Sequence, residues 1–583
     1  MSAAVALATV AACSSSGGSK SKTSGTAGNS SSASTPAKNT KTGGTVYYLT
    51  KRPTEHWDPT RIYVGRDIAD SSRLFYRTLV QYGTGAGADS NKLYPDLATD
   101  LGTASNGNKT WKFTLKSGIK WQDGSPITCA DVAYGISRSF ATDILTGGPN
   151  YSIQFLNIPA ETKDTKNWTS AYHGPFNKVG QALYDKAVSC TGNTITFNLK
   201  KPVGDFNFAT TLPAFAPYKQ SQDQGAKSNY SIFSDGPYML QGTWVKDKGA
   251  TFVRNPNYDP KTDSPGIRNA LPNQFVFVEG LATETIFDRL LANSGNDQFA
   301  VTDRAAPPAY LARVAAQKDR YTDVNSPFID YVVPNFTKMT NPLVRQALYL
   351  STDRAGYIAA EGGPSVASVA NGLVLPALGA AGGYKQFKAY DAPDSGDPTK
   401  AAALLKQAGV KLPYPIHFTY SGGTPTSDKQ ASALAAGWEK AGFKVTLEGL
   451  TDTYYDIVQN PANAAKYDVT WGGWGADWPN ASTVIPPLFD SRVNLSSTTN
   501  GQDYGLYKSD AVNAAIDKAY NTTDAAQRNA MWGDIDEMLA KDVAYVPLDN
   551  TKFPRLHGSK VTNYVESAST NGYPDLGQVG ASS

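Results

Sequence analysis

The chain has 583 residues, more than one hydrophobic core usually supports, and predicts roughly three to four domain-sized units. Its formal net charge is +3, and Lys and Arg are scattered along the sequence without the basic stripe that binds nucleic acid. Aromatic residues make up 11% of the chain, including 32 tyrosines and 10 tryptophans, which favours binding surfaces.

The N-terminus is a short apolar run, MSAAVALATVAAC, that ends in small residues. Residues 10–13 resemble a bacterial lipobox, in which Cys13 is lipidated and becomes the first residue of the exported protein. A disordered tail with a chance cysteine is the alternative. The run is shorter than the usual signal-peptide core and no Lys or Arg precedes it, which a start codon assigned too far downstream would explain.

Residues 14–42 are rich in Ser, Gly, Thr and Lys and lack apolar periodicity, so they predict a disordered tether. No later segment has about 18 continuous apolar residues, so we expect no other membrane attachment. If Cys13 carries lipid, Cys129 and Cys190 are left as a pair in an oxidising compartment, and we expect a disulfide between them. Two buried free thiols are the alternative.

From about residue 43 the sequence alternates strand and helix patterns, which indicates an α/β protein. One helix start is marked by a capping box, because Asp131 follows Thr128 by three residues. In chain order the predicted elements are strands 45–50 and 110–118, a helix from Thr128, strands 194–200 and 274–280, helix 283–295, strands 298–303 and 415–423, helix 427–442, strand 444–450, helix 451–461 and strand 466–471.

Enzyme motifs are absent from the sequence. It contains no G-x-S-x-G, H-E-x-x-H or C-x-x-C motif, and its four histidines are far apart. The segment 102–110 resembles a phosphate-binding loop but has one residue too many before its lysine, so we expect a turn there. The sequence does not exclude a catalytic pair of carboxylates that come together only in the folded structure.

The stretch WGGWGADWPN (471–480) places three tryptophans around Asp477, directly after predicted strand 466–471. Ligands of α/β sheets bind outside the carboxyl ends of strands, so this location favours a ligand site with aromatic walls and one anion. A hydrophobic turn with a solvated aspartate is the alternative.

Five stretches resemble, in the same order, signatures of the solute-binding proteins of peptide and nickel ABC importers, the oligopeptide- and dipeptide-binding branch. A closing segment, YVPLDNTKF, fits that family's return crossing between lobes. The five stretches are residues 93–138, SDGPYML (234–240), VRNPNY (253–258), NPLVRQALYLSTDRAGYI (341–358) and YDVTWGGWGADWP (467–479).

The resemblance implies a two-lobed, periplasmic-binding-protein-like (class II) fold with a two-strand hinge and an extra subdomain inserted in the first lobe. Both Cys129 and Cys190 fall in that subdomain. The implied parts are a first lobe at 43–326 with 547–583 returning to it, an inserted subdomain at about 76–210, a second lobe at 335–545, and hinge segments near 328–336 and 544–550.

The resemblance also implies a role for Asp477. In oligopeptide-binding members, the aspartate of a G-W-x-A-D-aromatic stretch holds the peptide's α-ammonium, and GWGADW matches that pattern. Trp474 and Trp478 would then wall the site, while the glycines would let the backbone approach the ligand.

Other implied ligand contacts come from the segment EHWDPTRIYVGRD (55–67), which resembles the family's first-lobe cleft. Trp57, Tyr63 and Arg66 would face the ligand. The alternatives are packing for Trp57 and Tyr63 and a solvated or salt-bridged side chain for Arg66. For the cation that binds the ligand's carboxylate, Arg304 is the candidate.

We therefore expect a lipid-anchored receptor on the extracytoplasmic face of the membrane. It would capture oligopeptides or dipeptides between two lobes and deliver them to an ABC permease as a monomer, without cofactor, metal, nucleic acid or chemistry on the ligand. One alternative keeps the fold but binds a metal chelate, an amine or an oligosaccharide. Others are a secreted hydrolase on this scaffold and a signalling receptor without transport.

Overall fold

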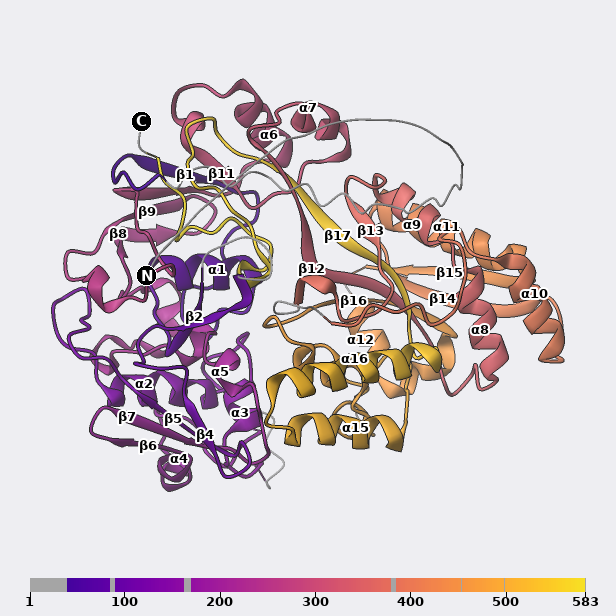
Figure 1. Ribbon diagram of the computed structural model, residues 1–583, viewed down its shortest axis with the longest axis horizontal. Helices are drawn as coiled ribbons and strands as arrows, with labels where there is room; N and C mark the ends of the chain where they lie inside the picture. Colours follow the sequence, from indigo (N-terminus) through magenta and orange to yellow (C-terminus); the bar gives the residue numbers. More distant parts are fainter. Residues whose placement is uncertain are drawn as a thin grey trace, which may run out of the picture. The chain divides into compact units, whose positions relative to one another are not determined.

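The structure is a computed structural model that describes residues 39–83, 90–161, 169–378, 384–451, 453–497 and 499–581 (Figure 1). The candidate lipidation site Cys13 and most of the predicted tether lie outside the described residues. Asn39–Ser583 cluster as one unit by their contacts, and the elements below all belong to it.

A five-stranded mixed sheet organises the N-terminal part of this unit. Its central strand β1 is parallel to both neighbours, β10 and β11, and the last two strands continue the sheet in antiparallel pairing. In sheet order the strands are β11 (Ala300–Thr302), β1 (Thr45–Leu49), β10 (Gln274–Val278), β9 (Gly249–Arg254) and β8 (Tyr238–Val245). The helices of this part are α1 (Gly65–Leu74), α6 (Thr283–Ala292) and α7 (Leu311–Ala315).

A separate antiparallel sheet lies between β1 and β8 in the sequence, and it has its own hydrophobic core. In sheet order its strands are β4 (Thr103–Ser105), β5 (Thr110–Thr114), β7 (Thr194–Asn198) and β6 (Val188–Thr191), and a small ribbon pairs β2 (Val80–Tyr82) with β3 (Leu93–Pro95). Its helices are α2 (Cys129–Ser137), α3 (Tyr151–Phe155), α4 (Gln181–Ala187) and α5 (Phe206–Ala209).

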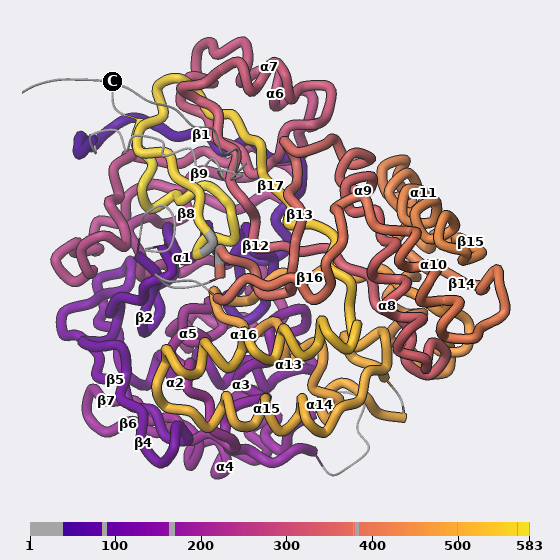
Figure 2. The backbone as a smooth tube through the Cα atoms, turned by 45° about the vertical axis from the view of Figure 1, so that its right-hand side comes forward, coloured from indigo at the N-terminus to yellow at the C-terminus, as the bar shows by residue number. Residues whose placement is uncertain are grey.

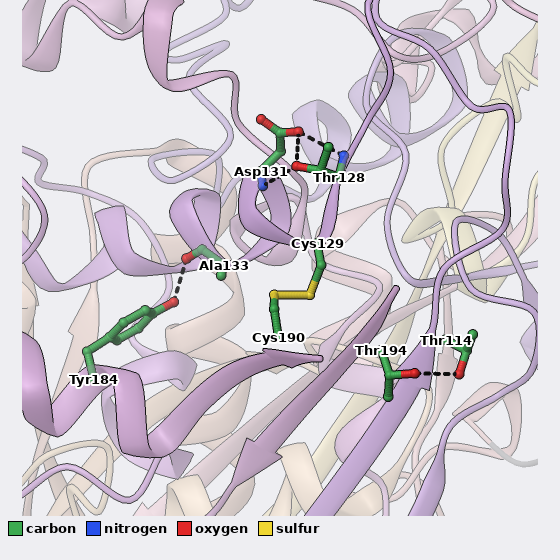
Figure 3. Close-up of a disulfide and its surroundings, with 8 residues drawn as sticks. All are labelled: Thr114, Thr128, Cys129, Asp131, Ala133, Tyr184, Cys190 and Thr194. Atoms are coloured by element: carbon green, nitrogen blue, oxygen red, sulfur yellow. Dashed lines mark hydrogen bonds between the residues drawn. A yellow bond between two sulfur atoms is a disulfide. The ribbon is translucent and has the colours of Figure 1, made fainter. Parts of the chain in front are cut away.

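A disulfide ties α2 to β6 in this segment, with the Cα atoms of Cys129 and Cys190 6.0 Å apart (Figure 3). The same helix begins with the predicted capping box. The Thr128 hydroxyl accepts from the Asp131 amide, and the Asp131 carboxylate accepts from the Thr128 amide at 2.8 Å. The capping prediction is therefore confirmed.

A six-stranded sheet organises the C-terminal part. In sheet order its strands are β13 (Ala367–Val369), β17 (Val546–Leu556), β12 (Tyr321–Pro334), β16 (Val469–Gly475), β14 (Tyr414–Ser421) and β15 (Phe443–Leu450). Parallel pairing joins β14 to β15 and to β16, whereas β16 pairs antiparallel with β12. Strand β16 ends at Gly475, so Asp477 lies directly after its carboxyl end.

Helices pack around this sheet, and two of them, α15 and α16, run side by side (Figure 2). Trp438 of α11 is fully buried and packs edge-on against Phe418 of β14, with ring centroids 5.1 Å apart. The helices are α8 (Pro342–Ser351), α9 (Arg354–Glu361), α10 (Pro398–Gln407), α11 (Pro425–Lys440), α12 (Tyr454–Val458), α13 (Ile485–Phe489), α14 (Ser491–Asn494), α15 (Asp510–Asn521) and α16 (Ala525–Lys541).

Strands β12 and β17 are the long connections of the fold, and they run side by side over most of their length (Figure 1). Residues 321–325 of β12 pair with 552–556, and after an irregularity residues 329–332 pair with 546–550. Only the second part of β12 also pairs with β16. Two adjacent strands with an irregular register at mid-length suit a crossing between two sheets.

Several sequence-predicted elements differ from the structure at their ends. The predicted strand 298–303 is shortened to β11, because a 3₁₀ turn, Gly295–Phe299, occupies its first residues. The predicted helix 451–461 is reduced to α12. The segment 102–110 forms β4, a turn and the start of β5, so the turn prediction for this loop is confirmed.

The disulfide should contribute substantially to stability because it closes a loop with a sequence separation of 61 residues. A loop of that length corresponds to about 4 kcal/mol in the chain-entropy description. We expect the double variant Cys129→Ala/Cys190→Ala to unfold at lower temperature, as measured by calorimetry. A reductant should lower the melting temperature of the parent protein but not that of the variant. Two free thiols in the non-reduced parent protein, measured with Ellman's reagent, would contradict this pairing.

Candidate functional site

Strand β16 presents aromatic side chains to two different cavities. Trp471 and Trp474 are three residues apart on the strand, so they point to opposite faces of the sheet. Trp471 lines a cavity of about 110 Å³ together with Asp330, and its indole N–H donates to the Tyr357 hydroxyl at 3.2 Å. Trp474 lines a second cavity of about 280 Å³ that also contains Asp477. The Trp474 indole N–H donates to the carbonyl of Thr483 at 2.8 Å, which fixes the ring.

The glycines of this stretch make room for the protein's own rings. A Cβ atom at Gly472 would lie 2.5 Å from the Tyr331 ring, and one at Gly475 would lie 2.4 Å from the Phe328 ring. Both rings belong to β12, which pairs with β16. The interpretation that these glycines let the backbone approach a ligand is therefore wrong for Gly472 and Gly475, because cross-strand packing fills that space.

Asp477 lies just past the end of β16, where it lines the larger cavity. The Tyr151 hydroxyl from α3 donates to its Oδ2 atom. Burial raises the pKa of Asp477 to about 6, while hydrogen bonds from the Tyr151 and Tyr63 hydroxyls limit the rise. Among the described residues no Lys, Arg or His forms an ion pair with this carboxylate. The site thus contains a carboxylate that lacks a cation.

Trp478 connects Asp477 to a distant segment of the chain. Its side chain is 3% exposed, and its ring centroid lies 4.8 Å from that of Tyr151. Its indole N–H donates to Oδ2 of Asp205 at 3.0 Å, and the Ser482 hydroxyl donates to the same oxygen. Asp205 directly precedes α5 and is 1% exposed. One wall of the cavity is therefore held together by hydrogen bonds between residues that are far apart in the sequence.

Tyr63 is the one residue from the predicted first-lobe segment that reaches this cavity. Its side chain is 42% exposed, and both burial and the Asp477 carboxylate raise the pKa of its hydroxyl. Trp57 does not line the cavity, because it is fully buried in an aromatic core where Phe75 and Trp244 pack edge-on against it, each at 5.2 Å between centroids. Trp57 therefore packs in the core, which was the alternative to a ligand contact.

The two arginines named from the sequence also lie away from the cavity. Arg66 is buried, and its guanidinium pairs with Asp67 at 2.6 Å and with Asp303 at 3.5 Å, so the salt-bridged alternative holds. Arg304 is not among the described residues that line the Asp477 cavity. Its backbone amide donates to the Thr302 hydroxyl beside β11.

Sequence reasoning missed several polar residues of this site, among them Tyr151, Lys201 and Asp205. Tyr151 and Asp205 are more than 250 residues away from their hydrogen-bond partners in the chain. No local sequence motif surrounds these residues. The one available signal is that they lie after or between predicted strands, where a loop could face a ligand. Within the described chain, no group of three or more His, Cys, Asp or Glu side chains could hold a metal ion.

Removing the Asp205 carboxylate should destabilise the protein, because it leaves the Trp478 and Ser482 donors without an acceptor at buried positions. We expect Asp205→Ala to lower the free energy of unfolding by about 1–3 kcal/mol, measured by urea titration. Asp205→Asn, which keeps a carbonyl acceptor, should lose less. The exposed Asp456→Ala is the control. An Asp205→Ala variant as stable as the control would contradict the role of this contact.

The chain is similar to known proteins over most of its length. The model of bacterial extracellular solute-binding proteins, family 5 (middle), matches residues 92–495. The "Probable D,D-dipeptide-binding periplasmic protein DdpA" of Escherichia coli is 24% identical over 515 residues, covering 84% of this chain and 85% of the relative. A dipeptide-binding protein of Lactococcus lactis is 25% identical over 501 residues, covering 80% and 82%.

Solved structures share the fold. The "Clavulanic acid biosynthesis oligopeptide binding protein 2" superimposes with a TM-score of 0.82 at 26% identity, covering 94% of this chain and 97% of that chain. Oligopeptide-binding protein OppA of Haemophilus influenzae superimposes with a TM-score of 0.61 at 21% identity, covering 94% and 100%. In the part of the chain that the structure describes, no helix is long and apolar enough to cross a bilayer. The predicted α/β, two-lobed fold is confirmed, and the chain belongs to family 5 of the bacterial extracellular solute-binding proteins.

Proposed function

We propose that this protein is an extracytoplasmic receptor that captures peptides by their α-ammonium group and delivers them to an ABC permease. The observation that carries the proposal is Asp477, a partly buried carboxylate in a cavity with aromatic walls and no cationic partner among the described residues. A ligand ammonium would supply the missing positive charge. Charge-assisted hydrogen bonds of this kind are about twice as strong as neutral ones.

Relatives support a peptide as the cargo. Besides the two relatives named for dipeptides, two structures of the same fold contain peptides, STSA in a Helicobacter pylori protein and RPPGFSPFR in the Haemophilus influenzae protein. A further relative, from Escherichia coli, carries the name "Probable deoxycholate-binding periplasmic protein YgiS" at 25% identity. A non-peptide cargo is therefore the second candidate, and the experiment below separates the two.

The proposed lobes follow the two large sheets. The first lobe, 43–326 with 547–583, holds the five-stranded sheet, and its inserted subdomain, about 76–210, holds the disulfide. The second lobe, 335–545, holds most of the six-stranded sheet. Strands β12 and β17 would form the hinge between them. Tyr151 and Asp477 would belong to different lobes. A ligand that replaces or reinforces their contact would therefore shift the equilibrium between the open and closed states towards the closed state.

We further propose that the receptor is a monomer that acts without catalysis and is attached to the membrane by lipid on Cys13. The lipobox-like residues and the polar tether that follows them support the anchor. The absence of the common nucleophile and metal motifs from the sequence supports a binding role.

The ammonium role of Asp477 predicts a loss of ligand in its variants. Native mass spectrometry of the domain from residue 39, purified from a rich-medium host, should detect bound peptides that denaturation releases. Asp477→Asn should lose them, since losing one partner of a buried charge pair costs about 2–5 kcal/mol. The exposed Asp456→Asn removes the same charge elsewhere and should retain them. A non-peptide passenger, or peptides retained by Asp477→Asn, would overturn the proposal.

The raised pKa of Asp477 predicts that peptide affinity depends on pH. Only the ionised carboxylate attracts an ammonium, and burial raises the pKa of this group to about 6. Affinity measured by calorimetry should therefore be highest near pH 7, where the carboxylate is ionised and the peptide's α-amino group, with a pKa of about 8, is still protonated. It should fall by up to tenfold per pH unit below about pH 6. Asp477→Asn should remove this dependence. An affinity that rises as pH falls from 7 to 5 would contradict an anionic Asp477.

A further inference from the structure

Three acidic side chains lie together where helix α9 packs against the long strands β12 and β17. Asp330 of β12 is directly opposite Asp549 of β17 in the antiparallel register, so both side chains point to the same face of the sheet. Tyr357 and Glu361 are four residues apart on α9 and therefore share one side of the helix. The Tyr357 hydroxyl donates to Oδ2 of Asp330 at 2.8 Å, whereas Glu361 lies beside Asp549.

Glu361 and Asp549 bring two carboxyl groups within hydrogen-bonding reach of each other. Asp549 is 0% exposed, and neither of its carboxyl oxygens has an aligned hydrogen-bond donor. Oε2 of Glu361 is likewise buried without a donor. Ionised carboxylates only accept hydrogen bonds, so two of them in a buried contact repel each other unless a proton lies between them. The contact therefore requires one shared proton.

The cations near this contact already have other partners. Among the described residues, no ion pair engages any of the three acids. Arg354 of α9 pairs with Asp394 at 3.4 Å, and Lys552 of β17 approaches Asp323 at 3.9 Å. Helix α7 also contacts β17, and its Arg313 pairs with a separate aspartate on α6. No positive side chain is thus left to neutralise the acids.

The other neighbours of the three acids are uncharged. Val369 of β13 is the second cross-strand partner of Asp549, and Gly473 of β16 is that of Asp330. Helix α11 contributes only uncharged side chains to the cavity beside Asp330, and the one other titratable group that faces this aspartate is the Tyr455 hydroxyl of α12. Water and protons, rather than protein charges, are therefore left to balance the acids.

Burial raises the pKa of both carboxyl groups in the contact, and the nearby Asp330 carboxylate raises it further. The contact itself raises the pKa of Asp549 and limits the rise at Glu361, which places the shared proton on Asp549. The Asp330 backbone amide offsets the rise at Asp549 only in part. Glu361 is also the last residue of α9, where the helix dipole disfavours a second negative charge.

The two aspartates lie in the predicted hinge segments, 328–336 and 544–550, while α9 lies within the proposed second lobe. We propose that a proton shared by Glu361 and Asp549 holds α9 against the hinge strand β17, and that loss of this proton at alkaline pH loosens the hinge. This inference rests on the hinge of the proposed function but not on its ligand. Its test therefore needs no peptide, and it can fail while peptide capture stands.

The shared proton makes folding depend on pH. In the unfolded chain both carboxyl groups ionise at about pH 4, whereas the folded protein keeps one proton to higher pH. The folding equilibrium constant should then fall by up to about tenfold per pH unit until that proton is lost. Asp549→Asn imitates the protonated acid, because its amide can donate to Glu361. This variant should lack the loss of stability.

Calorimetry without ligand between about pH 5 and pH 8.5 measures this difference. Asp549→Asn should melt at a higher temperature than the parent protein at the alkaline end, and the difference should shrink towards pH 5. Glu361→Gln places the donor on the other partner and should behave alike, and its partly exposed position makes a folding failure a lesser concern. The exposed Asp456→Asn is the control and should differ from the parent by the same amount at every pH.

Hydrogen exchange followed by mass spectrometry locates the effect. After correction for the intrinsic pH dependence of amide exchange, peptides that contain 329–332, 546–550 and α9 should lose protection at alkaline pH in the parent protein but not in Asp549→Asn. Peptides from α15 should behave alike in both proteins. A melting difference that does not change with pH would overturn the shared proton. Equal loss of protection in the two proteins would overturn its effect on the hinge.

Discussion

The carboxylate of Asp477 sets the constraint on which the site depends. Removing a charged carboxylate from water is costly unless a cation or hydrogen-bond donors replace the lost hydration. In this protein two tyrosine hydroxyls replace part of it, and the pKa of the group is still raised to about 6. A positive charge would compensate for the rest of the lost hydration, and the cavity has space for a ligand that carries one.

The surrounding architecture positions that carboxylate from both sides. Strand β16 is an interior strand of the six-stranded sheet, and Asp477 follows its carboxyl end. The glycines of β16 allow rings of β12 to pack closely against it. Beyond the strand, the Trp478 ring packs at a tilt against the Tyr151 ring, and the Trp478 indole N–H donates to Asp205. In the proposed two-lobed arrangement, hinge motion would make and break these contacts, so ligand binding and closure would depend on the same residues.

The sequence predicted the local parts of this arrangement well. The capping box at Thr128, the strand that leads into the tryptophan-rich stretch and the place of Asp477 beyond its end follow from short-range patterns. A signature shared with a family predicted the role that we propose for the aspartate, and the fold was predicted from the same resemblance. These features depend on neighbours within a few residues or on motifs that extend along the chain.

The missed residues depend instead on contacts across the fold. Nothing near Tyr151 or Lys201 in the sequence marks them as neighbours of Asp477, because that proximity arises only when two sheets come together. Trp57 shows the reverse error. It lies in a segment that resembles a cleft, yet its ring fills an aromatic core, since a large apolar side chain gains more from burial than from exposure to a wet cleft.

A crystal structure of the protein with Ala-Ala-Ala at neutral pH would test the account most directly. The account predicts that the peptide's terminal nitrogen lies about 2.7–3.2 Å from a carboxylate oxygen of Asp477, with the Trp474 and Trp478 rings beside it. A peptide whose nitrogen lies elsewhere in the cavity, while Asp477 keeps only its tyrosine donors, would contradict the central claim.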